Sequence, residues 1–123
     1  MHRVLVTGGA GVVGSALVPA LGEFGWRASV FDVARDPRAD ICVGPAIDSA
    51  AAECDGIIHM AAISRVAWGE EDPDRCLRIN VEGTRSVLRA ALQAPKRPWV
   101  LFISSREVYG NPGELPVVED CPT

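Results

Sequence analysis

The sequence contains no apolar run that is long enough to cross a membrane. Its longest apolar stretch, around Ile57 to Ile63, is far shorter than the roughly 20 residues that a bilayer requires. The first residues lead directly into a strand pattern, without the cationic flank, apolar core and cleavage site of a secretory signal. We therefore expect no membrane partner and a cytoplasmic location.

Positive charge and metal-ligand patterns are also scarce. The 12 Lys and Arg residues are outnumbered by 16 Asp and Glu residues, which gives a net charge of -4 at pH 7. Because an acidic surface repels phosphates, nucleic acid is not expected as a partner. The four cysteines lack C-x-x-C spacing, and His2 and His59 are isolated, so we predict no metal site and no cysteine chemistry.

Apolar and glycine patterning predicts a single domain, residues 1–123, in which strands and helices alternate. Hydrophobic residues make up 48% of the chain, which is enough for one buried core. Alternation of this kind predicts the α/β class, with a doubly wound parallel sheet of the Rossmann type. Buried strands are predicted at residues 2–7, 27–32, 56–60 and 99–104, with a very short one at 39–41, and helices at 11–24, 45–53 and 73–94.

The last predicted helix has a clear start signal. Asp72 can cap it, and Pro73 occupies the first helical position, where its missing N–H costs nothing. Residues between the preceding strand and Trp68 are predicted to form a loop. Apolar spacing predicts that the buried face of the helix consists of Leu77, Val81, Thr84, Leu88 and Leu92.

The sheet is expected to be incomplete on its C-terminal side. Residues 106–123 are loop-like and contain three prolines, so the strand at 99–104 is predicted to be an unpaired edge with exposed apolar surface. We therefore expect the isolated chain to self-associate. A compact monomer in size-exclusion chromatography would contradict that expectation.

A glycine-rich loop connects the first strand to the first helix. Glycines at positions 8, 11 and 14 follow the dinucleotide-binding spacing. Gly8 allows a tight turn, Gly11 allows the backbone to approach a pyrophosphate, and Gly14 allows close packing of helix and strand. The phosphates would then lie at the helix N-terminus. Such a triplet can also serve a plain strand-to-helix turn, so a second feature is needed.

Asp32 is that second feature. It ends the second predicted strand, about 20 residues beyond the loop, where a carboxylate can accept hydrogen bonds from the ribose hydroxyls of adenosine. Its negative charge would repel a 2′-phosphate, which favours NAD over NADP. Arg35 lies just beyond and would tolerate a 2′-phosphate if it faced the ribose, although a solvated position is the alternative.

Four ordered motifs resemble one known superfamily. They are Thr7-Gly8-x-x-Gly11-x-x-Gly14, His59-Met60-Ala61-Ala62, Asn80-Val81-x-Gly83-Thr84 and Ser104-Ser105-x-x-Val108-Tyr109-Gly110. Together they resemble the extended short-chain dehydrogenases/reductases, in particular the NAD-dependent sugar-nucleotide epimerases and dehydratases such as the UDP-glucose/UDP-galactose 4-epimerases. The resemblance covers the whole chain.

This resemblance implies a role for each matching residue. The adenosine ribose would be held by Asp32, and Asn80 would support the active site. Asp40 and Ile41 match the pair beside adenine, although a short strand and its cap explain them too. The pyrophosphate would be bound by Gly8, Gly11, Val12, Val13 and Gly14, and the nicotinamide-ribose side by Met60, Ala61 and Ala62.

The catalytic part of the resemblance is incomplete. Ser105 matches the catalytic Ser or Thr that hydrogen-bonds the sugar hydroxyl, but the sequence has no YxxxK motif, because Tyr109 is followed four residues later by Gly113. Residues 115–123 resemble the loop that leads to that motif. We therefore expect this chain to be the cofactor-binding portion of a longer enzyme. The chain would lack the substrate-binding portion and would be inactive alone.

Three functions are compatible with these residues. The first is an NAD-dependent sugar-nucleotide epimerase with a nucleotide-sugar substrate, and the resemblance is compatible with a homodimer. The second is a nucleotide-sugar decarboxylase, because Ser105-Arg106-Glu107 resembles its S/T-x-E triplet. A dehydratase would instead have Asp and Glu at positions 106 and 107. The third is a non-catalytic NAD sensor or scaffold that naturally lacks the base.

Overall fold

A parallel sheet forms the centre of the computed structural model, which describes residues 2–113 and 115–123. Within these residues the sheet has four strands in the order β2-β1-β3-β4. The chain passes from β1 to β2 on one side and returns to β3 on the other, which makes the β1–β3 boundary the switch point of a doubly wound sheet. The predicted fold class is confirmed. The strands are β1 (Arg3–Thr7), β2 (Arg27–Phe31), β3 (Gly56–His59) and β4 (Trp99–Phe102).

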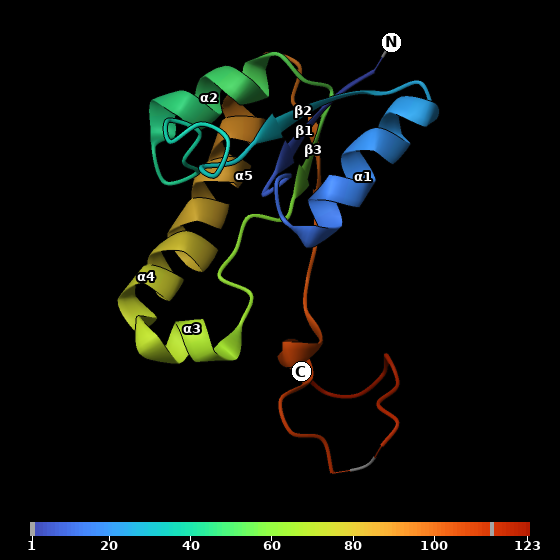
Figure 1. The fold of residues 1–123 in the computed structure, drawn as a ribbon, viewed down its shortest axis with the longest axis vertical. Helices are drawn as coiled ribbons and strands as arrows, with labels where there is room; N and C mark the ends of the chain where they lie inside the picture. Colours follow the sequence, from blue (N-terminus) through green and yellow to red (C-terminus); the bar gives the residue numbers. More distant parts are fainter. Residues whose placement is uncertain (1, 114) are drawn as a thin grey trace.

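Helices cover both faces of this sheet (Figure 1). Helix α1 (Val12–Glu23) lies on one face and continues through Pro19, while α2 (Gly44–Ala52) and α5 (Thr84–Gln93) lie on the other. Side chains of β1 alternate between the two faces, with Leu5 in the core under α2 and α5 and with Val4 and Val6 in the core under α1. The central strands β1 and β3 are therefore buried on both faces.

The helix predicted at residues 73–94 is divided into three segments. It begins as α4 (Pro73–Leu77), continues as a π-helical segment, η1 (Arg78–Gly83), and ends as α5. Its start is as predicted, because the Asp72 side chain accepts a hydrogen bond from the backbone N–H of Arg75 at 3.0 Å. The π-helical segment has no signal in the apolar spacing, and it changes which residues face the sheet.

The predicted buried face of this helix is wrong except at Thr84, which is half-buried and whose hydroxyl lies 2.9 Å from the buried His59 ring. The large side chains expected inside are between 44% and 71% exposed: Leu77, Val81, Leu88 and Leu92. Small residues face the core instead, because α5 packs closely on α2 and on the sheet. The buried residues of η1 and α5 are Gly83, Val87, Ala90 and Ala91.

Two shorter predictions are also corrected. Residues 39–41 form a turn rather than a strand, because the Asp40 carboxylate accepts from the Cys42 N–H at 2.8 Å and the Asp40 carbonyl accepts from the Val43 N–H at 3.0 Å. The segment expected to be a loop up to Trp68 contains a short helix, α3 (Val66–Glu71). Of the helices formed by the described residues, none has the length and apolar character of a membrane span.

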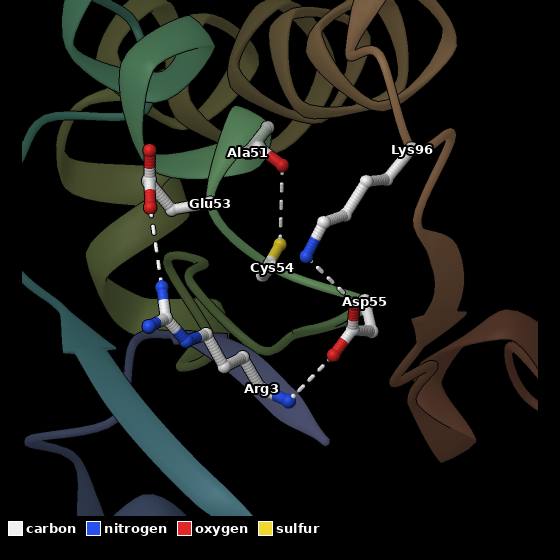
Figure 2. Close-up of polar contacts among 6 residues, drawn as sticks. All are labelled: Arg3, Ala51, Glu53, Cys54, Asp55 and Lys96. Atoms are coloured by element: carbon white, nitrogen blue, oxygen red, sulfur yellow. Dashed lines mark hydrogen bonds and ion pairs between the residues drawn. The ribbon is translucent and has the colours of Figure 1, made fainter. Parts of the chain in front are cut away.

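Charged side chains join the amino-terminal ends of the central strands (Figure 2). Asp55 accepts from the backbone N–H of Arg3 at 2.8 Å and pairs with Lys96 at 3.1 Å, while Arg3 also pairs with Glu53 at 3.2 Å. The Arg3 N–H and the Lys96 ammonium lower the pKa of Asp55. Because these groups are largely solvated, each ion pair contributes little. The cluster holds the start of β1 against the start of β3.

The outer edge of β4 leaves large apolar side chains in solvent. Trp99, Leu101, Phe102 and Ile103 are 44% to 56% exposed. This observation agrees with the expected incomplete side of the sheet, and the self-association expected from it stays a prediction.

The corrected face of α5 can be tested with two neighbouring substitutions. Val87→Ala should lower the free energy of unfolding by about 2 kcal/mol, because Val87 is fully buried and its truncation leaves a cavity. Leu88→Ala should change it by less than about 0.5 kcal/mol, because that side chain is 46% exposed. Urea denaturation of both variants measures the difference, and a larger loss in Leu88→Ala would restore the leucine face as the core.

Candidate functional site

The carboxyl-terminal ends of all four strands lie at one edge of the sheet. Thr7 is in register with Phe31 of β2 and with His59 of β3, and His59 is in register with Phe102 of β4. The segments that follow β1, β3 and β4 accordingly leave the sheet at the same end (Figure 1). The structure therefore places the predicted residues after each strand, Gly8, Asp32, Met60 and Ser105, along one edge, where ligands bind in sheets of this type.

The contact between Gly8 and the chain after β3 leaves no room for a side chain. A Cβ atom at Gly8 would lie 2.7 Å from the backbone nitrogen of Ala61 and 2.8 Å from the carbonyl carbon of Met60. Gly8 also has a φ of +71°, which side-chain-bearing residues rarely adopt. The glycine loop is thereby held directly against the end of β3.

The same loop is packed tightly against the start of α1. A Cβ atom at Gly14 would lie 2.5 Å from the Cα of Gly9, so helix and loop approach as closely as the sequence predicts. A Cβ atom at Gly11 would meet only the Gly8 carbonyl oxygen, at 3.2 Å. Gly14 is therefore needed for packing, whereas the space beside Gly11 is open to a ligand.

The amino-terminal end of α1 presents free backbone groups at this open space. Gly11 is its N-cap residue, and no side chain in the described part of the protein caps the helix. Val12 and Val13, the first helical residues, have side chains that are 91% and 64% exposed. Uncapped N–H groups and the helix dipole together favour an anion such as a phosphate.

Asp32 has a structural role that the sequence did not indicate. One carboxylate oxygen accepts from the Ala10 N–H at 2.9 Å, and the other accepts from the Ala34 N–H at 2.9 Å. The first of these bonds ties the glycine loop to the end of β2. Because each carboxylate oxygen can accept two hydrogen bonds, Asp32 keeps acceptor capacity for ribose hydroxyls.

Asp40 and Ile41 are placed less favourably for the role that the resemblance implies. Ile41 is 5% exposed and belongs to the core under α2 and α5. A Cβ atom at Gly83 would lie 2.5 Å from its Cδ1, so Gly83 makes room for Ile41. The Ile41 side chain therefore serves packing, and contact with adenine stays a prediction for this pair.

Thr7 fixes the backbone that follows β3. Its hydroxyl oxygen accepts from the N–H groups of Met60 and Ala61, at 3.2 and 3.3 Å. The Met60 N–H also lies 3.1 Å from the Thr7 carbonyl oxygen. Met60 and Ala61 are thus held at the switch point, while Ala62 lies beyond them with its surface exposed.

His59 is the functional candidate that sequence reasoning missed. It is 2% exposed, and its ring nitrogens lie 2.6 Å from the Thr7 hydroxyl and 2.9 Å from the Thr84 hydroxyl. Burial lowers the pKa of His59 below 6.5, so the ring is neutral at pH 7. A histidine inside the apolar strand at 56–60 was the available signal, because a buried polar side chain requires partners.

Asn80 holds the loop after β3 with two hydrogen bonds. Its side-chain oxygen accepts from the Ile63 N–H at 2.7 Å, and its amide donates to the Ile63 carbonyl at 3.0 Å. Asn80 lies in η1, and its own carbonyl accepts from the Thr84 hydroxyl at 2.7 Å. This geometry agrees with the supporting position that the resemblance implies for Asn80.

Ser105 lies just beyond the paired part of β4. The Ile103 N–H bonds the His59 carbonyl at 3.1 Å, which places the Ser105 backbone next to the chain after β3. The Ser105 hydroxyl oxygen accepts from the Glu107 N–H at 3.2 Å and caps a short 3-10 helix, η2 (Arg106–Tyr109). This bond uses a lone pair of the hydroxyl and not its proton.

Comparison with known proteins identifies the family. A model of the NAD dependent epimerase/dehydratase family matches residues 4–123, from β1 to the segment after β4. The chain belongs to this family. The predicted resemblance is therefore confirmed, and NAD is confirmed as the cofactor on which the family depends.

Relatives within the family have different activities. A 3-beta-hydroxysteroid dehydrogenase from Mycolicibacterium neoaurum is 37% identical, over 90% of this chain and 34% of that protein. A UDP-glucose 4-epimerase from Streptomyces lividans is 32% identical, over 98% of this chain and 41% of that protein. A UDP-N-acetyl-alpha-D-glucosaminuronate decarboxylase from Bacillus cytotoxicus is 32% identical, over 96% of this chain and 40% of that protein. The chain thus spans 34% to 41% of the length of these relatives.

Solved structures of family members have the same fold. UDP-glucose 4-epimerase from Brucella ovis, in complex with NAD, has a TM-score of 0.87 and 32% identity over 99% of this chain and 41% of that one. A short-chain dehydrogenase/reductase superfamily protein from Agrobacterium tumefaciens, with bound NAD, has a TM-score of 0.83 and 36% identity over 98% of this chain and 38% of that one. RMD from Pseudomonas aeruginosa, complexed with NADPH, has a TM-score of 0.81 and 30% identity over 100% of this chain and 43% of that one.

The neutral state of His59 predicts a dependence of stability on pH. Its pKa is lowered in the folded protein, so the unfolded chain binds more protons as the pH falls through about 6.5. The contribution of His59 to the free energy of unfolding should therefore be complete above about pH 7 and decrease toward about pH 5. Urea denaturation at several pH values in this range measures the decrease.

Two variants identify the group responsible. His59→Gln cannot titrate and should lose most of this decrease, whereas His2→Gln, at an exposed position, should retain it. The same pH dependence in His59→Gln and in the unsubstituted protein would show that His59 does not cause it.

Proposed function

We propose that this chain is the cofactor-binding portion of an NAD-dependent sugar-nucleotide epimerase. The observation that carries the proposal is the geometry at the end of β1. There the uncapped N-terminus of α1, with the open side of its N-cap residue Gly11, meets the carboxylate of Asp32 from the end of β2 through one hydrogen bond, from the Ala10 N–H to Asp32. A pyrophosphate and a ribose joined to it require this combination of donors and acceptors.

The residues at the edge fit NAD in a specific orientation. The N–H groups of Val12 and Val13 would hold the pyrophosphate beside the open space at Gly11, whose own N–H donates to the Gly8 carbonyl at 3.1 Å, and Gly14 would keep the helix close to it. Asp32 would accept from the adenosine ribose hydroxyls, and its charge would repel a 2′-phosphate. The nicotinamide-ribose side would then extend toward the backbone of Met60 to Ala62, and the adenine toward Asp40 and Ile41.

The chemistry proposed for this site is a reversible hydride transfer. NAD, when bound, supplies the hydride acceptor. Ser105 would donate a hydrogen bond to the oxygen of the sugar being oxidised, since its observed bond to the Glu107 N–H leaves the hydroxyl hydrogen free. The sequence has no YxxxK motif to take the proton from the sugar, so we propose that these 123 residues bind the cofactor but do not turn over.

Decarboxylation is the second candidate, and a specific feature favours it. Glu107 follows Ser105 with the spacing of the S/T-x-E triplet, and a decarboxylase is among the relatives. Its carboxylate is paired with Arg106 at 3.0 Å. Dehydration is less well supported despite a dTDP-glucose 4,6-dehydratase relative at 35% identity, because Arg106 occupies the position at which that activity uses Asp.

A homodimer is part of the same proposal. Val81 of η1 and Leu88 and Leu92 of α5 form an exposed apolar stripe, the leucine stripe, along one side of these helices. Such a stripe on a soluble protein is a typical contact surface between subunits. A nucleotide sugar is the proposed small-molecule substrate, as the names of the epimerase and decarboxylase relatives suggest.

Cofactor binding can be tested with one glycine substitution and a matched control. Calorimetric titration should detect saturable NAD binding, with NADP bound more weakly. Gly11→Ala should weaken NAD binding by at least about tenfold, since its Cβ would enter the space beside the helix N-terminus, where the one neighbouring atom is the Gly8 carbonyl oxygen at 3.2 Å. Gly22→Ala, in the same helix with no neighbouring atom within 4 Å, should bind NAD normally. Unchanged NAD affinity in Gly11→Ala would show that the glycine loop does not contact NAD.

The reaction itself can be tested with the substrates named for two relatives. UDP-glucose and UDP-glucuronic acid are incubated with NAD and either this chain or any longer product of its gene, and the products are analysed by NMR. We expect inversion at C4 of UDP-glucose by a longer product and no turnover by the 123 residues. Release of carbon dioxide from UDP-glucuronic acid would favour the decarboxylase, and NAD binding by a longer product without either reaction would favour the sensor.

A further inference from the structure

We propose that His59 and Thr84 are positioning residues for the cofactor site, acting through a chain of hydrogen bonds that runs from Thr7 to Asn80. The inference deepens the proposed function and rests on it, since it concerns the backbone against which the nicotinamide half of NAD would lie. Neither residue is proposed to touch the cofactor. Their effect is transmitted by the bonds that they make inside the protein.

The distances determine which atom donates each hydrogen bond between Thr7 and Asn80. The Thr84 hydroxyl donates to the Asn80 carbonyl at 2.7 Å, so its oxygen can only accept from His59, at 2.9 Å. The Nε2 atom of His59 must therefore carry the ring proton. The Nδ1 atom is then an acceptor, and it receives the Thr7 hydroxyl proton at 2.6 Å.

The Thr7 end of the chain determines the backbone at Met60 and Ala61. Because the Thr7 proton points to His59, both lone pairs of its oxygen face the Met60 and Ala61 N–H groups, at 3.2 and 3.3 Å. These are the residues whose backbone lies against Gly8. The hydroxyl oxygen is the acceptor for the Ala61 N–H and a second acceptor for the Met60 N–H, which also donates to the Thr7 carbonyl at 3.1 Å. The orientation of this hydroxyl thus contributes to the contact between the end of β3 and the glycine loop.

The Asn80 end of the chain determines the backbone at Ile63. Thr84 anchors the Asn80 carbonyl, and the Asn80 side chain bonds both the N–H and the carbonyl of Ile63. The stretch from Met60 to Ile63 is therefore fixed at both ends by one continuous set of bonds. His59 is the link between the two ends, since it precedes Met60 and reaches both hydroxyls.

Packing alone does not explain these polar residues. An apolar side chain would fill the position of His59 without the cost of burying an imidazole and two hydroxyls. Among the described residues no buried side-chain polar atom is left without a hydrogen-bond partner, so every buried polar atom of this hydrogen-bond network is paired. A fully satisfied buried network permits few alternative arrangements, which is the property required of a rigid cofactor support.

The first experiment separates positioning from stability. Thr84→Val removes the hydroxyl but keeps the branched shape, Thr84→Ser keeps the hydroxyl, and Val87→Ala destabilises the same helix outside the network. Calorimetry should show NAD binding weakened about tenfold in Thr84→Val. In Thr84→Ser and Val87→Ala it should change by less than about twofold. The amide NMR signals of Met60, Ala61 and Ile63 should shift in Thr84→Val without NAD.

The second experiment observes His59 directly. Nitrogen NMR of the full 123-residue chain should show a neutral ring with its proton on Nε2. His59→Gln, which keeps one acceptor and one donor, should bind NAD better than His59→Leu, which keeps neither. A proton on Nδ1, equal affinities of these two variants, or equal losses in Thr84→Val and Val87→Ala would overturn the inference.

The same titrations distinguish the inference from the proposed function. If the unsubstituted chain does not bind NAD, the proposed function and the inference fall together. If it binds NAD and Thr84→Val binds equally well, only the positioning role is overturned and the cofactor site stands.

Discussion

The close contact between Gly8 and the backbone of Met60 and Ala61 is the constraint on which the rest of the site depends. No side chain fits between them, so the ends of β1 and β3 are in direct backbone contact. This contact fixes where the chain turns after β1, and therefore where α1 begins. It also brings the Thr7 hydroxyl within reach of three groups on the neighbouring strand. The glycine loop and the hydrogen bonds that support it thus depend on one close approach of two strands.

The two ends of the sheet carry different kinds of polar contact. At the amino-terminal end, solvated hydrogen bonds and ion pairs around Asp55 join the starts of β1 and β3, as Figure 2 shows, although each ion pair contributes little to stability. At the carboxyl-terminal end, the Thr7–His59 hydrogen bond is buried, the N-terminus of α1 has no side-chain cap among the described residues, and the predicted cofactor residues that follow a strand lie there. Parallel sheets allow this division because all strands end on the same side.

Local patterns in the sequence were sufficient for the four strands of the sheet, for α1, α2 and the start of α4, and for the glycine loop, but not for the turn near residue 40, for α3 or for η1. Strand–helix alternation, the glycine spacing and the Asp72–Pro73 start signal each depend on residues within a few positions of one another, and the structure agrees with them. The buried face of α5 was not predictable in this way. Leucines and alanines both recur at helical spacing, and only the close approach of α5 to α2 determines that the alanines are buried and the leucines exposed. The His59 chain joins residues 52 and 25 positions apart, which no local pattern relates.

The π-helical segment between α4 and α5 determines the angular relation between the two halves of that helix. Each residue of an α-helix advances the chain by about 100°, so the wider turn of η1 rotates α5 relative to α4 by an amount that no regular helix provides. Loss of one residue from this segment would turn α5 by about 100° relative to α4 and bring Leu88 toward the place of Val87 in the core. The segment also carries Asn80, which bonds Ile63, and Gly83, which makes room for Ile41, so an insertion or deletion here would alter the core and the anchoring of the chain after β3 at once.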